Sequence, residues 1–241
     1  MMGKVIMSGI VPPLVAPISG ILASDLAVGS VVKLMENGIA TEYLVVNQGI
    51  PSGSSLYDAS CDGTWLLRKE LKEARQWHSS AVSKYQNSTI HTWLNGDFFN
   101  LFGSVEQAAI KQAKIPYVDN SASDGPLVSG ANGLSTKAFL LSGNEVGFIH
   151  DILLDGAKLD YFNSGEDTTS NNKRVGYLNG TAESWWLRSP NGDRTASWTV
   201  ISVGSSGVTV CYVKSICVRP AIILPSTAVF DETTMLLKGV A

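Results

Sequence analysis

The residues best suited to bind a cation occur together in the segment Asp58-Ala59-Ser60-Cys61-Asp62-Gly63. This segment matches the first half of an EF-hand calcium loop, whose alternate side-chain oxygens ligate Ca²⁺. The twelfth position of such a loop should be a bidentate Glu, but here it is Lys69, and no helix pattern precedes the segment. We therefore interpret it as a turn stabilised by Asp side chains, and we predict no metal site and no cofactor.

Residues that serve in catalysis are present but scattered. The histidines His78, His91 and His150 fall in no HExxH or HxH spacing, and Gly204-Ser205-Ser206-Gly207 lacks the spacing of a nucleophilic serine turn. The sequence contains no phosphate-binding P-loop and no GxGxxG before a helix. Several carboxylates lie in polar segments, where solvation is their ordinary state: Asp119, Asp124, Asp155, Asp160 and Asp167. These observations predict no catalytic residue.

The three cysteines, Cys61, Cys211 and Cys217, are odd in number and form no CxxC motif. This pattern supports neither a disulfide framework nor a structural zinc site. We expect buried or half-buried thiols in a reducing compartment.

Charge and hydrophobicity exclude further classes of protein. The 241 residues carry a net charge of −3 and no basic cluster, which disfavours binding to nucleic acid. Pro, Gly and Ser interrupt the apolar stretches, so we expect no membrane insertion. A single Lys4 precedes Pro12 and Pro13 without a continuous apolar stretch, and this pattern predicts no signal peptide.

The elements that must position any site begin after an apolar, Pro-interrupted segment. We interpret residues 1–28 as an extended N-terminal arm for oligomerisation or attachment, and residues 29–241 as one domain. Val31 to Leu34 and Tyr43 to Val46 predict a hairpin that turns at Asn37-Gly38. Trp65 to Arg68 predicts a short strand or the start of a helix.

Three segments carry helix-start signals. Ser88 precedes apolar residues with helical spacing, namely Ile90, Trp93, Leu94 and Phe98. Ser104 with Gln107, and Ser142 with Glu145, each form the capping-box pattern of a helix start. The polar stretches 119–132 and 163–172 are predicted to be surface loops.

The C-terminal part of the domain changes to strand-like sequence. Trp198 to Ile201 and Val208 to Val213 flank a turn at Gly204 to Gly207, and Val218 to Leu224 follows. The chain as a whole is therefore predicted to be α+β, with an early hairpin, helices in the middle and an antiparallel β ribbon at the end.

The motif Ser184-Trp-Trp-Leu-Arg-Ser-Pro190, followed by Val218-Arg-Pro-Ala221, resembles a family of uncharacterised domains from gut Firmicutes and their prophages. The blocks LYDASCDGTWLLRK from Leu56, STIHTWLNGDF from Ser88 and GANGLSTKAFLLSGNEVGF from Gly130 are similar to the same family, over roughly residues 28–225. One position departs from the family pattern, because Cys217 stands where Gly usually precedes VRP.

The C-terminal layout also resembles the variable proteins of diversity-generating retroelements, which have a C-type-lectin-like fold shared with formylglycine-generating enzymes. This resemblance implies a non-enzymatic receptor-binding protein of a phage tail, located in the virion after synthesis in the host cytoplasm. It implies a bacterial surface protein or glycan as ligand, other tail proteins as partners and a homo-oligomer, with a trimer expected. The ribbon, about residues 185–221, would carry the binding surface.

Within that ribbon, we expect the outward side chains to bind the ligand, together with Trp198 as contact area. They are Asn191, Asp193, Arg194, Ser197, Thr199, Ile201, Val203, Thr209, Cys211, Tyr212, Lys214 and Ile216. Four residues are expected to support the scaffold. Trp185 and Trp186 would fill the core, Arg188 would pair with a buried carboxylate or carbonyl, and Arg219 would fix a strand end.

Three alternatives remain open at this point. One is a structural tail or baseplate component whose ribbon is an assembly interface, with its apolar residues facing a second sheet or a neighbouring subunit. Cys211 and Cys217 admit an oxidase related to formylglycine-generating enzymes, although they lie where the family varies or has Gly. A carbohydrate-binding adhesin of a bacterial surface is the third, and the lack of a signal sequence disfavours it.

Overall fold

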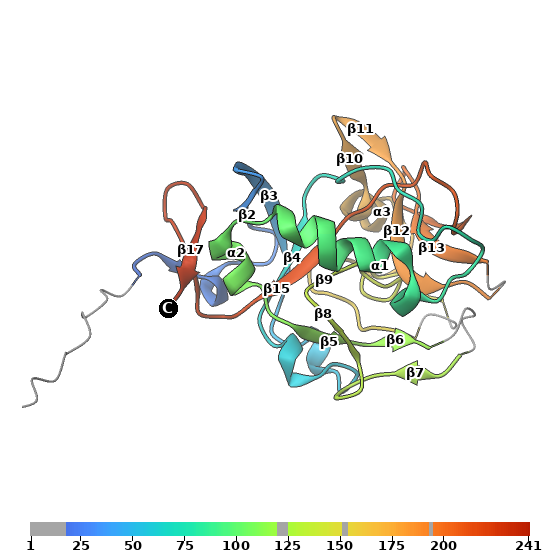
Figure 1. Cartoon of the computed structure of the whole chain (residues 1–241), viewed down its shortest axis with the longest axis horizontal. Helices are drawn as coiled ribbons and strands as arrows, with labels where there is room; N and C mark the ends of the chain where they lie inside the picture. Colours follow the sequence, from blue (N-terminus) through green and yellow to red (C-terminus); the bar gives the residue numbers. More distant parts are fainter. Residues whose placement is uncertain (1–17, 120–124, 151–153, 193–194) are drawn as a thin grey trace, which may run out of the picture.

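The computed structural model describes residues 18–119, 125–150, 154–192 and 195–241. Strands dominate in these residues, and the α-helices among them are short (Figure 1). The predicted α+β class is therefore confirmed.

A five-stranded sheet forms the centre of the domain, in the order β2-β3-β4-β15-β9. Its strands are β2 (Val31–Glu36), β3 (Ile39–Gln48), β4 (Thr64–Arg68), β15 (Ala221–Leu224) and β9 (Ala138–Phe139). The predicted hairpin is confirmed as β2 and β3, whose turn residues Asn37 and Gly38 both have positive φ, 48° and 77°. This conformation matches the right-handed twist of the strands, and Asn-Gly adopts it readily.

Strand β15 corrects one boundary of the predicted ribbon. It lies between β4 and β9 in the central sheet, where Ile222 pairs with Leu66 on one side and Ala138 on the other. All four of its side chains are buried, as expected for a strand covered on both faces. The segment that ends in Ala221 to Leu224 therefore belongs to the core and not to the ribbon.

A second, three-stranded antiparallel sheet contains the rest of the ribbon. Its order is β12 (Trp185–Pro190), β13 (Ala196–Val200) and β14 (Ser206–Val210). A turn through Gly204, at φ +88°, joins β13 to β14 close to the predicted position. Strands β12 and β13 are buried along their whole length, so β14 carries the exposed edge.

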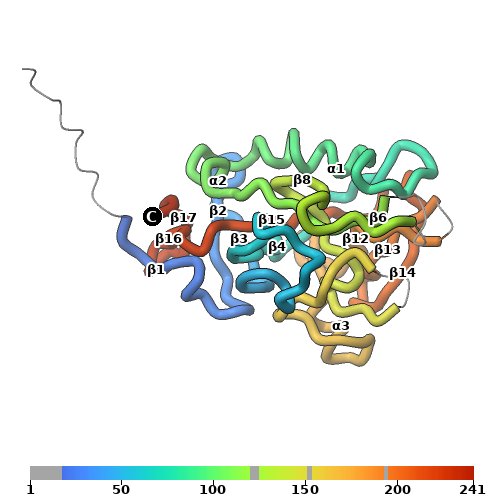
Figure 2. Tube along the Cα trace, turned by 90° about the horizontal axis from the view of Figure 1, so that it is seen from below, coloured from blue at the N-terminus to red at the C-terminus, as the bar shows by residue number. Residues whose placement is uncertain are grey.

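The two described chain ends meet in a third sheet, formed by β1 (Ile21–Leu22), β16 (Ala228–Phe230) and β17 (Leu237–Val240). The second half of the predicted arm therefore belongs to the domain, because β1 pairs with β16 and Ala23 is buried. The first half of the arm, residues 1–17, lies outside the described residues. In both views this sheet lies at the opposite end of the molecule from β12 and β13 (Figures 1 and 2).

The helices confirm one predicted start and correct the others. Helix α1 (Thr89–Trp93) begins as predicted, because the Ser88 hydroxyl accepts a hydrogen bond from the His91 N–H at 3.2 Å. Helix α2 (Ser104–Ala109) has Gly103 as its N-cap, one residue before the predicted Ser104, and the predicted capping box does not form. Figure 2 shows α1 and α2 on one side of the central sheet and α3 on the other.

Helix α3 (Thr168–Arg174) occupies a stretch predicted to be loop. Its N-cap is Asp167, whose carboxylate accepts hydrogen bonds from the N–H groups of Thr169 and Ser170. The predicted capping box of Ser142 and Glu145 does form, but it closes a turn and not a helix.

Short two-stranded ladders complete the described part of the chain. They are β5 (Ala113–Ile115) with β8 (Leu134–Thr136), β6 (Tyr117–Val118) with β7 (Leu127–Val128), and β10 (Gly176–Leu178) with β11 (Thr181–Glu183). The β7 strand lies within the polar stretch predicted to be a surface loop, of which residues 120–124 are outside the described residues. Of the described helices, none has the length and apolar character needed to cross a membrane.

Candidate functional site

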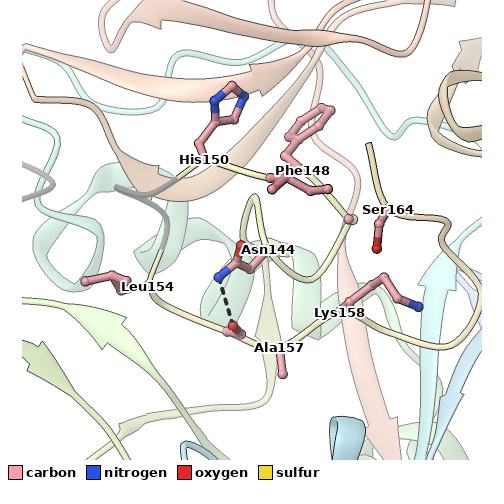
Figure 3. A pocket seen from close by; sticks show the side chains of 10 residues that line it. Asn144, Phe148, His150, Leu154, Ala157, Lys158 and Ser164 are labelled. Atoms are coloured by element: carbon pink, nitrogen blue, oxygen red, sulfur yellow. Dashed lines mark hydrogen bonds between the residues drawn. The ribbon is translucent and has the colours of Figure 1, made fainter. Parts of the chain in front are cut away.

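A pocket of about 480 Å³ opens beside the sheet of β12, β13 and β14 (Figure 3). Its walls come from three segments that lie apart in the sequence: residues 144–150, residues 154–158 and Ser164. The volume is within the range of small-molecule sites. The side chains that line it are Asn144, Phe148, Ile149, His150, Leu154, Ala157, Lys158 and Ser164.

Arg188, from the WWLRSP motif, holds the first wall of the pocket. Its guanidinium donates to both carboxylate oxygens of Glu145, at 2.5 and 2.7 Å, and both side chains are fully buried. Burial alone would lower the pKa of Arg188, but the Glu145 carboxylate outweighs it and the net shift is upward. The guanidinium therefore remains charged, and the predicted pairing of Arg188 with a buried carboxylate is confirmed.

The same strand also holds the second wall. Arg188 donates to the carbonyl of Asp155 at 2.5 Å, and the Ser189 hydroxyl donates to the Asp155 carboxylate at 2.7 Å. Tyr57 joins the two walls, because its hydroxyl donates to Glu145 at 2.8 Å and accepts from the Ala157 N–H at 2.9 Å. Burial raises the pKa of Asp155, although Arg188 opposes the shift.

Arg174, at the end of α3, holds the third wall and the turn of the ribbon. Its guanidinium donates to the carbonyls of Val146 at 3.0 Å, Gly165 at 2.7 Å and Gly204 at 2.8 Å. It lies 4.4 Å from the ring centre of Phe148, and burial lowers its pKa. Sequence reasoning missed this residue. The Asp167 cap with two basic residues in the last turn was the signal that would have revealed α3.

His150 connects the pocket to the ribbon. Its ring centre lies 4.7 Å from that of Trp198, and its Nε2 is 3.3 Å from a carboxylate oxygen of Glu166. Glu166 in turn accepts hydrogen bonds from the Ser206 N–H and hydroxyl, at 3.1 and 2.8 Å. Burial opposes ionisation of Glu166, but these hydrogen bonds outweigh it and lower its pKa.

Large apolar side chains are exposed in the pocket and on the ribbon. Ile149 is 70% exposed and Leu154 is 50% exposed, and both line the pocket. Val203 and Tyr212 are exposed in the turns that flank β14. Exposed aliphatic residues that line a pocket are typical of a surface that binds a ligand.

The predicted ligand-binding residues of the ribbon differ in their exposure to solvent. Val203, Tyr212 and Lys214 are exposed, and four residues are half-buried: Asn191, Ile201, Thr209 and Ile216. Asp193 and Arg194 lie outside the described residues. The prediction of outward side chains is wrong for Ser197, Thr199 and Cys211, which are buried, and Trp198 is also buried.

The error has a physical cause. Strand β13 is the central strand of its sheet, and both of its faces are covered, so alternation of inward and outward residues does not apply to it. The Ser197 hydroxyl, for example, lies within hydrogen-bond distance of the carbonyls of Leu187 and Ser189. The surface available for binding is therefore the β14 edge with its flanking turns, together with the pocket.

The predicted scaffold residues lie where the sequence suggested. Trp185 and Trp186 are fully buried, and their indole N–H groups donate to the carbonyls of Arg174 and Arg75. Arg219 lies 5.2 Å from the ring centre of Trp185 and donates to the carbonyl of Arg68. These contacts hold Arg219 in place directly before strand β15, as predicted for this residue.

The residues considered for metal and thiol chemistry lie in other surroundings. Asp58 accepts a hydrogen bond from the Ser60 N–H, which confirms the Asp-stabilised turn. All three cysteines are buried outside disulfides, and burial raises the pKa of Cys61 to about 12 and of Cys217 to about 11. Among the described residues, no three His, Cys, Asp or Glu side chains are grouped so that they hold a metal ion.

Comparison with known proteins identifies a family. A family model described as a domain of unknown function, DUF6273, matches residues 62–226, which include the pocket and the ribbon. No curated protein and no solved structure matches the chain.

Proposed function

We propose that this chain, which belongs to the DUF6273 family, is a non-enzymatic ligand-binding protein. Its ligand site would be the pocket together with the exposed β14 edge. The observation that carries the proposal is that Arg188 and Arg174 fix all three pocket walls, while Ile149 and Leu154 remain exposed on them. A rigid site with apolar contact area binds a ligand at little cost in conformational entropy.

The biological setting that we propose is the tail of a phage that recognises a bacterial surface. It rests on the resemblance to retroelement-diversified receptor-binding proteins, which also supplies the proposed C-type-lectin-like fold. The sheet of β1, β16 and β17 lies at the opposite end of the molecule from β12 and β13 (Figure 2), so attachment through that sheet would leave the ribbon end free to meet a ligand.

The proposal does not include enzyme activity. The raised pKa values of Cys61 and Cys217 keep both thiols protonated at neutral pH, whereas a thiol nucleophile needs a lowered pKa. The His150 ring lies against Trp198, and its Nε2 is 3.3 Å from Glu166. The oxidase alternative therefore has little support.

The test is binding of the fluorescently labelled chain to intact cells of gut Firmicutes strains. We expect saturable binding to some strains, and Ile149→Asp or Leu154→Asp should weaken it at least about tenfold. The matched control is Ile39→Asp, at a residue that is 69% exposed on the β2–β3 hairpin and outside the pocket lining. This control should bind like the parent chain.

Two results would contradict the proposal: binding to no strain, or equal loss in the control and the pocket variants. Antibody labelling of virions then tests the alternative role as a structural tail or baseplate component. A structural tail component would be found within the tail or baseplate, with the exposed Val208 of β14 in an assembly contact. A receptor-binding protein would be found at the tail tip, and light scattering of the purified chain tests the expected trimer.

A further inference from the structure

The charge of the pocket gives information about its ligand. Among the described lining residues, Lys158 is cationic and none is Asp or Glu. The described carboxylates around it already have partners: Glu166 accepts hydrogen bonds from Ser206, the buried Glu145 pairs with Arg188, and Asp155 accepts from Ser189. A site of this composition favours an anionic group over a cationic one.

Lys158 is held so that it retains donor capacity. Its ammonium donates to the carbonyl of Phe162 at 3.0 Å and approaches the carbonyl of Leu159 at 3.5 Å. An ammonium has three N–H donors, so at least one remains for a ligand. Figure 3 shows the Ser164 hydroxyl on the same side of the pocket as Lys158. An ammonium and a hydroxyl together suit a carboxylate or phosphate oxygen.

The rest of the lining suits a polar body with apolar faces. Ile149 and Leu154 offer aliphatic surface, while the Asn144 amide is held in place by its bond to the Gly156 carbonyl at 3.2 Å. Two wall glycines pack closely against neighbouring segments. A Cβ at Gly156 would lie 2.5 Å from the Ser142 hydroxyl oxygen, and one at Gly147 would lie 2.2 Å from the Asn163 carbonyl oxygen. A side chain at either position would therefore force the walls apart.

We propose that the pocket binds an anionic saccharide, a sugar or polyol that carries a carboxylate or a phosphate. The acidic group would bind to Lys158 and Ser164, and the C–H surface of the sugar would pack on Ile149 and Leu154. This inference rests on the proposed function, because it names the chemical class of the ligand at the same site.

The experiment is titration of the full chain, labelled with ¹⁵N, with four probes followed by NMR. Glucuronate carries a carboxylate and glycerol 1-phosphate carries a phosphate, while glucose and glycerol are their neutral counterparts. At least one acidic probe should shift the amide signals of residues 144–150, 154–158 and 164, with an affinity at least about tenfold above that of its neutral counterpart. Added NaCl should weaken this binding. The acidic probe that binds identifies the source of the charge.

Variants of Lys158 test its role directly. Lys158→Gln should lower the affinity for the acidic probe at least about tenfold, while Lys158→Arg, which keeps the charge, should retain most of it. The matched control is Lys69→Gln, because Lys69 is an exposed lysine paired with Glu42 in the central sheet. If Lys158→Gln fails to fold, two other measurements test the inference: the signal shifts of the parent chain and the affinity of Ser164→Ala for the acidic probe. Ser164→Ala should lower the affinity about threefold or more.

Equal affinity for acidic and neutral probes, or undiminished binding by the folded Lys158→Gln variant, would overturn the inference. Its failure is distinguishable from failure of the proposed function. Cell binding that depends on Ile149 while acidic probes do not bind rejects only the ligand class. Probe binding in the pocket without binding to any cell rejects the proposed receptor role and keeps the ligand class.

Discussion

Arg188 and Glu145 form an ion pair with two hydrogen bonds, at 2.5 and 2.7 Å, in which neither side chain is exposed to solvent. The pair joins strand β12 to the turn that carries the first pocket wall. The remaining donors of Arg188 bind the carbonyls of Pro116, Leu140 and Asp155. One side chain thus connects the motif WWLRSP to two of the three walls of the pocket.

Removal of either partner should destabilise the domain strongly. We expect Arg188→Met to lower the free energy of unfolding by about 3–5 kcal/mol, because it leaves the Glu145 carboxylate buried without its cation. The double variant Arg188→Met/Glu145→Met should recover part of this loss, since no unpaired charge remains. Urea unfolding of the single and double variants measures both effects. A loss below about 1 kcal/mol in Arg188→Met would show that the pair does not hold the walls.

Gly204 is expected to be essential for the turn between β13 and β14. It has φ +88°, and a Cβ there would lie 2.1 Å from the carbonyl oxygen of Asn171. Gly180 is a matched control with φ +82° and no atom within 4 Å of its Cβ position. We expect Gly180→Ala to cost about 1–2 kcal/mol from backbone strain alone, and Gly204→Ala about 1–3 kcal/mol more because of the clash.

Thermal unfolding measures this difference, and hydrogen exchange locates it. Gly204→Ala should increase the exchange of the amides at Ile201 and Gly204, which bond within the turn. Equal stability of the two variants would mean that the turn moves freely away from α3.

His91 should make stability depend on pH. Burial lowers its pKa from an ordinary 6.5 to about 4, so the folded state binds fewer protons than the unfolded state between these values. Its contribution to stability is therefore present above pH 6.5 and is lost as the pH falls toward 4. Between pH 7 and pH 5 the loss should be about 2 kcal/mol.

The test compares urea unfolding at pH 7 and pH 5 for the parent chain and for His91→Phe, which keeps an aromatic ring beside Tyr85. The variant should lose most of the difference between the two pH values. The control His78→Phe should keep the difference in stability between the two pH values. A parent chain equally stable at both pH values would refute the role of His91.

The three cysteines should resist alkylation in the native state. All are buried, and the pKa of Cys61 is raised to about 12 and that of Cys217 to about 11, so neither is a thiolate at pH 8. We expect iodoacetamide to modify none of them in the folded chain within an hour and all three after denaturation, as measured by mass spectrometry. Rapid modification of Cys211 or Cys217 in the folded chain would revive the oxidase alternative.

Local sequence signals predicted the parts of the fold that depend on local physics. Asn37-Gly38 set a turn and Ser88 capped a helix, because each acts on backbone groups only a few residues away. The burial of β13 depends on what covers its second face, and Ser197 and Thr199 alone do not reveal that. The pocket could not be predicted either, since Asn144, Lys158 and Ser164 are brought together by long-range contacts, among them those of Arg188, Tyr57 and Arg174.

If a retroelement diversifies this locus, the structure predicts which codons vary. Side chains at Val203, Tyr212 and Lys214 are exposed, so substitution there changes the surface at little cost to folding. Ser197, Thr199 and Cys211 are buried, so most substitutions there destabilise the sheet. Sequencing of codons 190–218 from many cells or virions of one lineage should show several-fold more nonsynonymous changes at the exposed set.

The flanking motifs serve as the internal control for this count. Both motifs, Trp185 to Pro190 and Val218 to Ala221, are buried. Arg188 and Ser189 of the first hold two pocket walls, and Ala221 of the second pairs in the central sheet, so neither motif should vary. Changes spread evenly over buried and exposed codons would indicate ordinary drift in a chain under weak selection. A ribbon identical in every cell would refute diversification, and the pocket would then be a site of fixed specificity, for which the acidic probes remain the direct assay.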